Sequence, residues 1–182
     1  MSRKPRNWYP GAVYHITDRG NRQMSIFMDD KDRLKYMNLL EETRTYFPFT
    51  LHAYCLMTNH LHLLLETINH HPQDIMKMLN SRYGIYFNYR HDLVGHVFQG
   101  RYKSAMVDSP EYFLNASRYI HLNPVEGDIV QDPARYKWSS YSAYASDAHN
   151  PHISTERILS YFPEPKKDHY RRIIENEIAL LK

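Results

Sequence analysis

Residues 49–67 hold two strand-like segments joined by only three residues, and this arrangement constrains the fold more than any other feature. Residues 49–57 and 61–67 are runs of mainly apolar and aromatic side chains, as expected for strands. The link between them, Thr58-Asn59-His60, is short enough to connect the two strands of a hairpin. The sequence therefore predicts an antiparallel pair of strands in this part of the chain.

Segments with strand or helix periodicity surround this hairpin. In chain order they predict a strand over 12–17, a helix over 29–46, a helix over 72–89 and a bent strand over 98–107. The complete order is then β-α-β-β-α-β. We therefore predict an α+β fold of the ferredoxin-like type, in which helices cover one face of an antiparallel sheet.

A further helix is expected to begin at Pro110. Ser109 suits the N-cap position, and proline suits the first helical position because its missing N–H is not needed there. This helix should end near Asn123, because Pro124 disfavours helical geometry in the residue before it.

The chain changes character after Val125. Residues 126–153 hold Gly, Pro, Asp and Ser with little apolar periodicity, which predicts loops, whereas residues 154–182 regain helical periodicity. We predict one domain over 1–125 and a loop and helical C-terminal extension over 126–182 that packs on the same domain.

Composition indicates an ordinary globular protein of the cytoplasm. Hydrophobic residues make up 42% of the chain and charged residues 24%, which are average values. The sequence has no run of about 18 apolar residues, and its basic N-terminus lacks an apolar signal core. The single cysteine, Cys55, cannot form an internal disulfide and fits a reducing compartment. We therefore expect no membrane segment and no export.

Two histidines in the second strand of the hairpin are candidate metal ligands. Alternate residues of a strand point to the same face, so His60 and His62 should project side by side, with Leu61 and Leu63 on the buried face. Two imidazoles at this spacing form half of a metal site. The alternative is that both simply occupy the wet face of an antiparallel strand.

A second candidate pair lies near the end of the helix that begins at Pro110. Tyr119 and Asn123 are four residues apart and therefore lie on one helix face. Together with the two histidines, they offer a nucleophile and a third metal ligand. A phenol ionises near pH ~10 and is a weak nucleophile at neutral pH, so it benefits from a metal ion beside an anionic target such as a phosphodiester.

Six ordered motifs carry a resemblance to a known family. They are Tyr14-His15-Ile16, Arg19-Gly20-Asn21, Met57-Thr58-Asn59-His60-Leu61-His62, residues 98–103 (FQGRYK), residues 118–124 (RYIHLNP) and residues 138–141 (WSSY). With these motifs the chain resembles the single-tyrosine HUH transposases, particularly the REP-associated tyrosine transposases of bacteria.

The resemblance implies a function for the candidate residues. Tyr119 would be the nucleophile that forms a 5′-phosphotyrosine link with single-stranded or hairpin DNA, and His60 and His62 would bind Mg²⁺ or Mn²⁺. Asn123 stands at the position of a polar third ligand, where many related enzymes have glutamine. The resemblance also implies palindromic DNA repeats as partner and a monomer, although related enzymes often act as dimers.

Basic residues near these motifs are candidates for DNA binding. The chain has a net charge of +3 and is rich in tyrosine and histidine, a composition that suits phosphate contacts and base stacking. The candidates are Arg3, Lys4, Arg6, Arg19, Arg22, Arg101, Lys103 and Arg118.

Four other polar residues are further candidates near the site. His15 lies on the first strand and is a candidate neighbour that orients the site, whereas His121 should face away from Tyr119 and be structural or on the surface. Asp18, at the end of the first strand, and Glu66 are weaker candidates for metal contact. Glu66 lies on the same face as His62 but roughly 13 Å away along the strand.

Two other classes of function remain open from the sequence. The chain could be a ferredoxin-like module that binds nucleic acid without cleaving it. It could also be a metal-dependent hydrolase that uses water, with Tyr119 in a structural role.

Overall fold

A four-stranded antiparallel sheet in the order β2-β3-β1-β4 forms the centre of the fold. The computed structural model describes residues 8–180. The strands are β1 (Val13–Arg19), β2 (Phe49–Leu56), β3 (His60–Thr67) and β4 (Lys103–Val107). The longer helices are α1 (Asp30–Tyr46), α2 (Pro72–His91), α3 (Pro110–Glu126) and α6 (Lys166–Leu180), and the shorter ones are α4 (Tyr141–Ala145) and α5 (Glu156–Leu159). This arrangement confirms the predicted β-α-β-β-α-β order and the ferredoxin-like fold.

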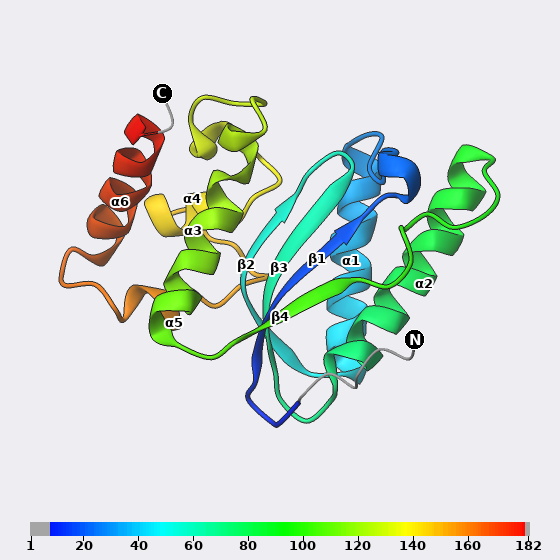
Figure 1. Ribbon diagram of the computed structural model, residues 1–182, viewed down its shortest axis with the longest axis horizontal. Coiled ribbons are helices and arrows are strands. Elements are labelled where there is room, and N and C mark those ends of the chain that lie inside the picture. The colour runs from blue at the N-terminus through cyan, green and yellow to red at the C-terminus, as the bar shows by residue number, and fades with distance from the viewer. Residues whose placement is uncertain (1–7, 181–182) are drawn as a thin grey trace.

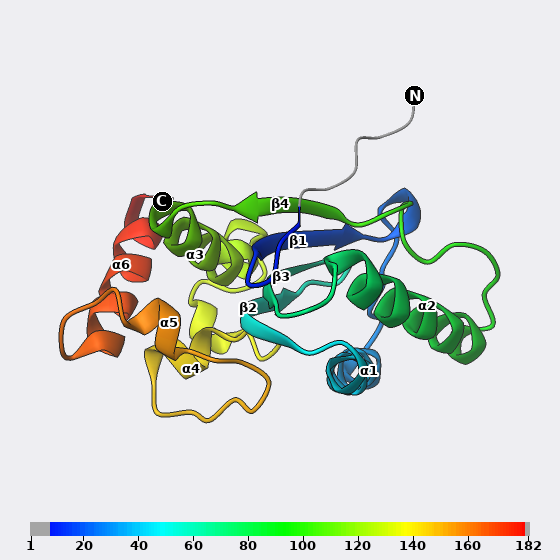
Figure 2. The ribbon, with the colours of Figure 1, turned by 90° about the horizontal axis from the view of Figure 1, so that it is seen from below.

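Helices cover both faces of the sheet, and each face has its own apolar core. Figure 2 shows α1 and α2 on one side of the sheet and α3 with the C-terminal helices on the other. Strand alternation sends Leu61 and Leu63 of β3 into the core beside α1 and α2, whereas Leu64 enters the core beside α3. The predicted coverage of one face by helices is therefore incomplete: α1 and α2 cover one face, and α3 with the C-terminal helices covers the other.

The strand predicted over 98–107 is shorter in the structure. β4 begins at Lys103, and Phe98 forms only an isolated bridge with Gly20. Between them Gly100 has φ +73°, a conformation that turns the chain out of the sheet ladder and favours glycine. The segment before β4 therefore forms an edge loop next to the end of β1.

The predicted end of α3 at Asn123 is wrong. The helix continues through Pro124 to Glu126, and the N–H of Gly127 donates to the carbonyl of Asn123 at 2.9 Å. A proline in the last helical turn removes one donor but leaves this closing bond intact, so the turn survives. Asn123 therefore stays within the helix, one turn after Tyr119.

The C-terminal residues pack on α3 and its face of the sheet (Figure 1). The segment expected to form only loops also contains a 3₁₀ turn, Pro133–Arg135, and α4. Tyr170 and Ile174 of α6 are fully buried, and the phenol of Tyr170 hydrogen-bonds Nδ1 of His121 at 2.7 Å. Leu181, at the end of the helical periodicity predicted over 154–182, lies outside the described residues.

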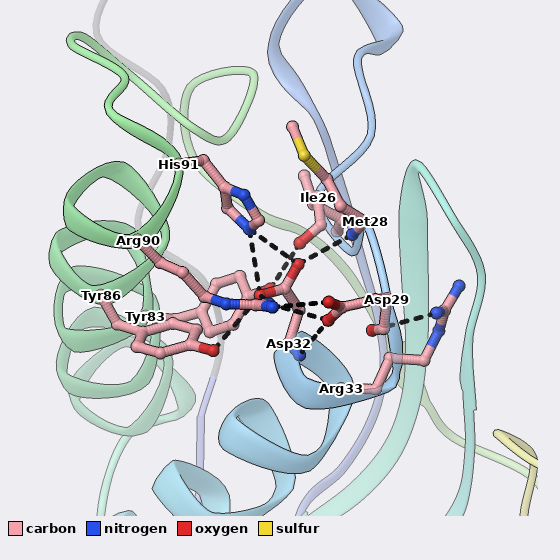
Figure 3. Close-up of polar contacts among 9 residues, drawn as sticks. All are labelled: Ile26, Met28, Asp29, Asp32, Arg33, Tyr83, Tyr86, Arg90 and His91. Atoms are coloured by element: carbon pink, nitrogen blue, oxygen red, sulfur yellow. Dashed lines mark hydrogen bonds and ion pairs between the residues drawn. The ribbon is translucent and has the colours of Figure 1, made fainter.

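A polar cluster joins the first turn of α1 to the last turn of α2 (Figure 3). Asp32 is fully buried and accepts hydrogen bonds from Arg90, Tyr86 and the N–H of Met28, and it also contacts His91 at 3.0 Å. Arg90 also pairs with Asp29, the N-cap of α1. A buried carboxylate needs such partners. The cluster fixes the end of α2, from which the chain runs back toward β4.

Candidate active site

Both histidines of β3 face α3, where Tyr119 projects between the helix and the sheet. The rings of His60 and His62 lie 5.1 Å apart between centroids, and the ring of Tyr119 lies 5.3 Å from that of His62 in an edge-on contact. Strand alternation accounts for the first pair, and packing of α3 across β2 and β3 brings the tyrosine to them. All three side chains come from one chain.

These side chains line a cleft of about 640 Å³. Three of the candidate basic residues, Arg19, Arg101 and Lys103, line the same cleft. Arg19 ends β1, Lys103 begins β4, and Arg101 belongs to the segment just before β4. Tyr119 is 43% exposed, so a ligand in the cleft has access to its phenol. The cleft combines a tyrosine, two imidazoles and a positive charge that suits an anionic ligand.

Both ring nitrogens of His60 face amide oxygens. Nε2 lies 2.9 Å from Oδ1 of Asn123, and Nδ1 lies 2.7 Å from Oδ1 of Asn59. Burial lowers the pKa of His60, which favours the neutral ring at neutral pH. A neutral imidazole carries a single N–H, so only one of the two oxygens can receive a hydrogen bond.

His62 has one bonded and one unpartnered nitrogen. Nδ1 lies 3.1 Å from Nε2 of His15 and 3.3 Å from Oγ1 of Thr17. Nε2 is buried without a hydrogen-bond partner among the described residues. Burial, followed by the neighbouring His15 and His60, lowers the pKa of His62 to about 3. The ring is therefore neutral at neutral pH, with a lone pair available at one nitrogen.

The donor set fits a divalent cation. Two ligands at adjacent corners of an octahedron, each about 2.1 Å from the ion, lie about 3 Å apart, close to the 2.9 Å between Nε2 of His60 and Oδ1 of Asn123. The unpartnered Nε2 of His62 offers a third donor. Among residues 8–180 no three His, Cys, Asp or Glu side chains are grouped for a metal, so any ligand beyond the two histidines would come from another group, such as the amide of Asn123 or water.

Other sequence candidates lie elsewhere. Arg22 lines a separate pocket next to the loop after α2, and Arg118 pairs with Glu177 of α6 at 3.1 Å. Arg3, Lys4 and Arg6 lie outside the described residues. His121 is fully buried between Tyr170 and Ser140 on the far side of α3 from the cleft.

The two acidic candidates have structural partners. Glu66 bonds His52 at 2.8 Å and Arg157 at 2.6 Å. The carboxylate of Asp18 is buried and accepts hydrogen bonds from Asn80 of α2 at 2.5 Å and from the N–H of Arg19 at 2.9 Å.

Asn59 and Thr17 were not singled out in the sequence. Both line the cleft and contact a histidine directly. Asn59 immediately precedes His60 within the motif of residues 57–62, so this motif could have identified it. Thr17 gave none, because its contact with His62 depends on the pairing of β1 with β3.

The family match places the chain among the DNA transposases, a class of DNA-cleaving enzyme. The family model described as "Transposase IS200 like" matches residues 9–123, which is more than half of the chain. The chain therefore belongs to the IS200-like transposase family.

Two solved structures are similar to this chain. One is described as a REP-associated tyrosine transposase bound to a REP hairpin; it is 15% identical, has a TM-score of 0.67, and the match covers 85% of this chain and 92% of that one. The other, a candidate transposase from Deinococcus radiodurans R1, is 19% identical with a TM-score of 0.46 and coverage of 65% and 95%. The first confirms the fold.

A search of curated proteins found no match. Within residues 8–180, no helix combines the length and apolar character that crossing a bilayer requires.

Proposed function

We propose that this transposase cleaves and rejoins single-stranded or hairpin DNA through a covalent bond between Tyr119 and a 5′ phosphate. The observation that carries the proposal is the position of Tyr119, which is 43% exposed and packs edge-on against the ring of His62. A purely structural role would not explain why an exposed tyrosine lies beside two histidines in a cleft lined by basic residues.

The chemical step needs no external energy source. The phenolic oxygen of Tyr119 attacks the phosphorus, the bond from phosphorus to the 3′ oxygen breaks, and that oxygen leaves as a 3′-hydroxyl. The proton lost by the phenol balances the proton gained by the leaving oxygen. The phosphotyrosine conserves the energy of the phosphodiester, so a second 3′-hydroxyl can reverse the step and join strands.

His60, His62 and Asn123 are proposed to hold Mg²⁺ or Mn²⁺. Imidazole ligands favour Mn²⁺, whereas abundance in cells favours Mg²⁺. A divalent cation bound there would offset the negative charge that develops on the scissile phosphate. The support is a buried nitrogen of His62 with no partner among the described residues, together with a nitrogen–oxygen pair of His60 and Asn123 at ligand spacing.

Arg19, Arg101 and Lys103 are proposed to contact phosphates on either side of the scissile bond. They line the cleft that contains Tyr119, and such contacts position a strand without reading its sequence. Arg22, Arg118 and the residues Arg3, Lys4 and Arg6 remain candidates for contacts farther along the DNA. A palindromic hairpin is the proposed substrate, supported by the similar structure described as bound to a REP hairpin.

A denaturing gel tests the proposal. Hairpin DNA labelled at its 3′ end should transfer the label to the protein, because the 5′ phosphate of that fragment joins the tyrosine. Tyr119→Phe removes only the hydroxyl, so the labelled band should vanish while hairpin binding persists. Tyr112→Phe, on the same helix, is the matched control and should keep the band. Cleavage without any protein-linked product would instead favour a hydrolase, and binding without cleavage a binding module.

A further inference from the structure

Asn59 presents an oxygen to His60 in an orientation that its other contact fixes. Its Nδ2 donates to the carbonyl of Gln23 at 3.4 Å, so its Oδ1 is the atom that lies 2.7 Å from Nδ1 of His60. The main chain of Asn59 is also held, because its carbonyl accepts the N–H of Gly20 at 2.8 Å. An amide oxygen can only accept. Oδ1 of Asn123 also faces this ring, 2.9 Å from Nε2, but no hydrogen bond among the described residues holds the nitrogen of that amide, so it can turn and donate to Nε2. Because the amide of Asn59 is held and that of Asn123 is not, we place the proton of a neutral His60 on Nδ1.

His15 presents a nitrogen to His62 in the same way. If the proton of His62 were on Nε2, it would be a buried donor with no acceptor among the described residues, which is costly. With the proton on Nδ1, the ring donates to Nε2 of His15 at 3.1 Å. Thr17 lies slightly farther from the same atom, at 3.3 Å.

His15 also contacts the candidate nucleophile. Its ring lies 5.8 Å from the ring of Tyr119 in an edge-on contact. The residue on β1 therefore connects the tyrosine of α3 with the histidine of β3. The contact of His15 with Tyr119 depends on the shape of the His15 ring, whereas its contact with His62 depends on Nε2 of that ring. A substitution that keeps a ring but removes the nitrogen therefore separates the two contacts.

We infer that Asn59 and His15 are positioning residues that set the tautomers of His60 and His62, placing both protons on Nδ1 and leaving a lone pair on each Nε2. This inference rests on the proposed role of the two histidines as ligands. A ligand imidazole whose other nitrogen is held by an acceptor is fixed in tautomer and orientation, and loss of that acceptor typically lowers metal affinity about 10- to 100-fold.

The direct test is the nitrogen NMR spectrum of the metal-free protein at pH ~8, where an ordinary histidine is neutral. The spectrum reports which nitrogen of each imidazole carries the proton. We expect both His60 and His62 to be protonated on Nδ1 in the unaltered protein. A proton on Nε2 of either ring would overturn the inference for that histidine. This measurement requires no variant to fold and no metal to bind.

Calorimetry with Mn²⁺ alone, without DNA, gives a second test. His15→Phe keeps the ring against Tyr119 but removes the acceptor, and Asn59→Leu removes the amide at similar size. Each should weaken Mn²⁺ binding about 10- to 100-fold, whereas Asn59→Asp, which keeps an acceptor, should stay within a few fold. His149→Phe and Asn38→Leu, at exposed positions, are the matched controls and should have no effect.

His62→Ala separates the two proposals. If His62→Ala leaves Mn²⁺ binding unchanged, the proposed ligand set itself is wrong. If His62→Ala abolishes binding but His15→Phe and Asn59→Leu bind as tightly as the unaltered protein, the ligand set stands and the positioning role is overturned.

Discussion

Nε2 of His60 lies 2.9 Å from Oδ1 of Asn123, and the two atoms are both acceptors whenever the proton of His60 is on Nδ1. Two lone pairs at this distance repel each other unless a cation lies between them or, in the metal-free protein, the amide of Asn123 turns to donate from its Nδ2. The pair joins β3 to α3 beside Tyr119. A divalent ion held by this pair would therefore lie close to Tyr119, which is one helical turn before Asn123.

The ligand proposal predicts separate effects on cleavage and on binding. His60→Ala and His62→Ala should each abolish cleavage and leave hairpin affinity within a few fold, because phosphate contacts supply most of the binding energy. Cleavage should need added Mg²⁺ or Mn²⁺ and stop with chelator, as measured on labelled DNA. His149→Ala, at an exposed position, should have no effect. Full cleavage by chelator-treated protein would contradict the proposal.

The basic residues of the cleft should govern the dependence of DNA binding on salt. Arg101→Ala and Lys103→Ala should each weaken binding by similar factors for all DNA sequences and reduce the logarithmic salt slope by about 1. Affinities over a range of salt concentrations measure this slope. Arg172→Ala, on the exposed face of α6, is the matched control. A salt slope that is unchanged in both cleft variants would mean that Arg101 and Lys103 do not contact DNA phosphates.

Much of the fold could be predicted, because its strands and helices have clear periodicity. The positions at which individual helices and strands begin and end were less predictable. Whether Pro124 ends α3 depends on the bond from Gly127 to Asn123, and whether Phe98 belongs to a strand depends on the backbone of Gly100. Both outcomes are set by local backbone geometry at the end of an element, which is the least certain part of a prediction from a single sequence.

The candidate site was predictable in part for the same reason. His60 and His62 share a face through strand geometry, and Tyr119 and Asn123 share a face through helix geometry. The contacts of Asn59 and His15 depend instead on how strands pair and how a turn folds back. Arg118 was a DNA-binding candidate from the sequence, but in the structure it pairs with Glu177 of the C-terminal helix, a contact that depends on how that helix packs.

Asp18 should make stability fall as pH rises. Burial raises the pKa of its carboxyl to about 7, above its ordinary value, so between about pH 4 and 7 the folded state binds more protons than the unfolded chain. The free energy of unfolding should then decrease across this range, by up to roughly 4 kcal/mol at about 1.4 kcal/mol per pKa unit.

Asp18→Asn removes this titration and tests the assignment. Urea unfolding at pH 5 and pH 8 should show a smaller decrease in the variant than in the unaltered protein. Asp147→Asn, at an exposed position, should retain the full decrease. An identical pH dependence in Asp18→Asn would mean that the carboxyl is not held protonated.

The active site should be complete within one chain. The rings of His60, His62 and Tyr119 come together in a single copy, so we propose a monomer. Mixing Tyr119→Phe with His60→Ala protein should restore no cleavage, and light scattering should give the mass of one chain. Restored cleavage in the mixture would show that two copies share the histidines and the tyrosine.

The most direct test of the central proposal is to map the residue that becomes joined to DNA. The chain contains 16 tyrosines, so a covalent band alone does not identify the nucleophile. After digestion of the protein–DNA product, mass spectrometry should find the 5′-phosphorylated nucleotide only on the peptide that contains Tyr119. A nucleotide on a different tyrosine, or cleaved DNA whose 5′ phosphate is free from the start of the reaction, would contradict the account.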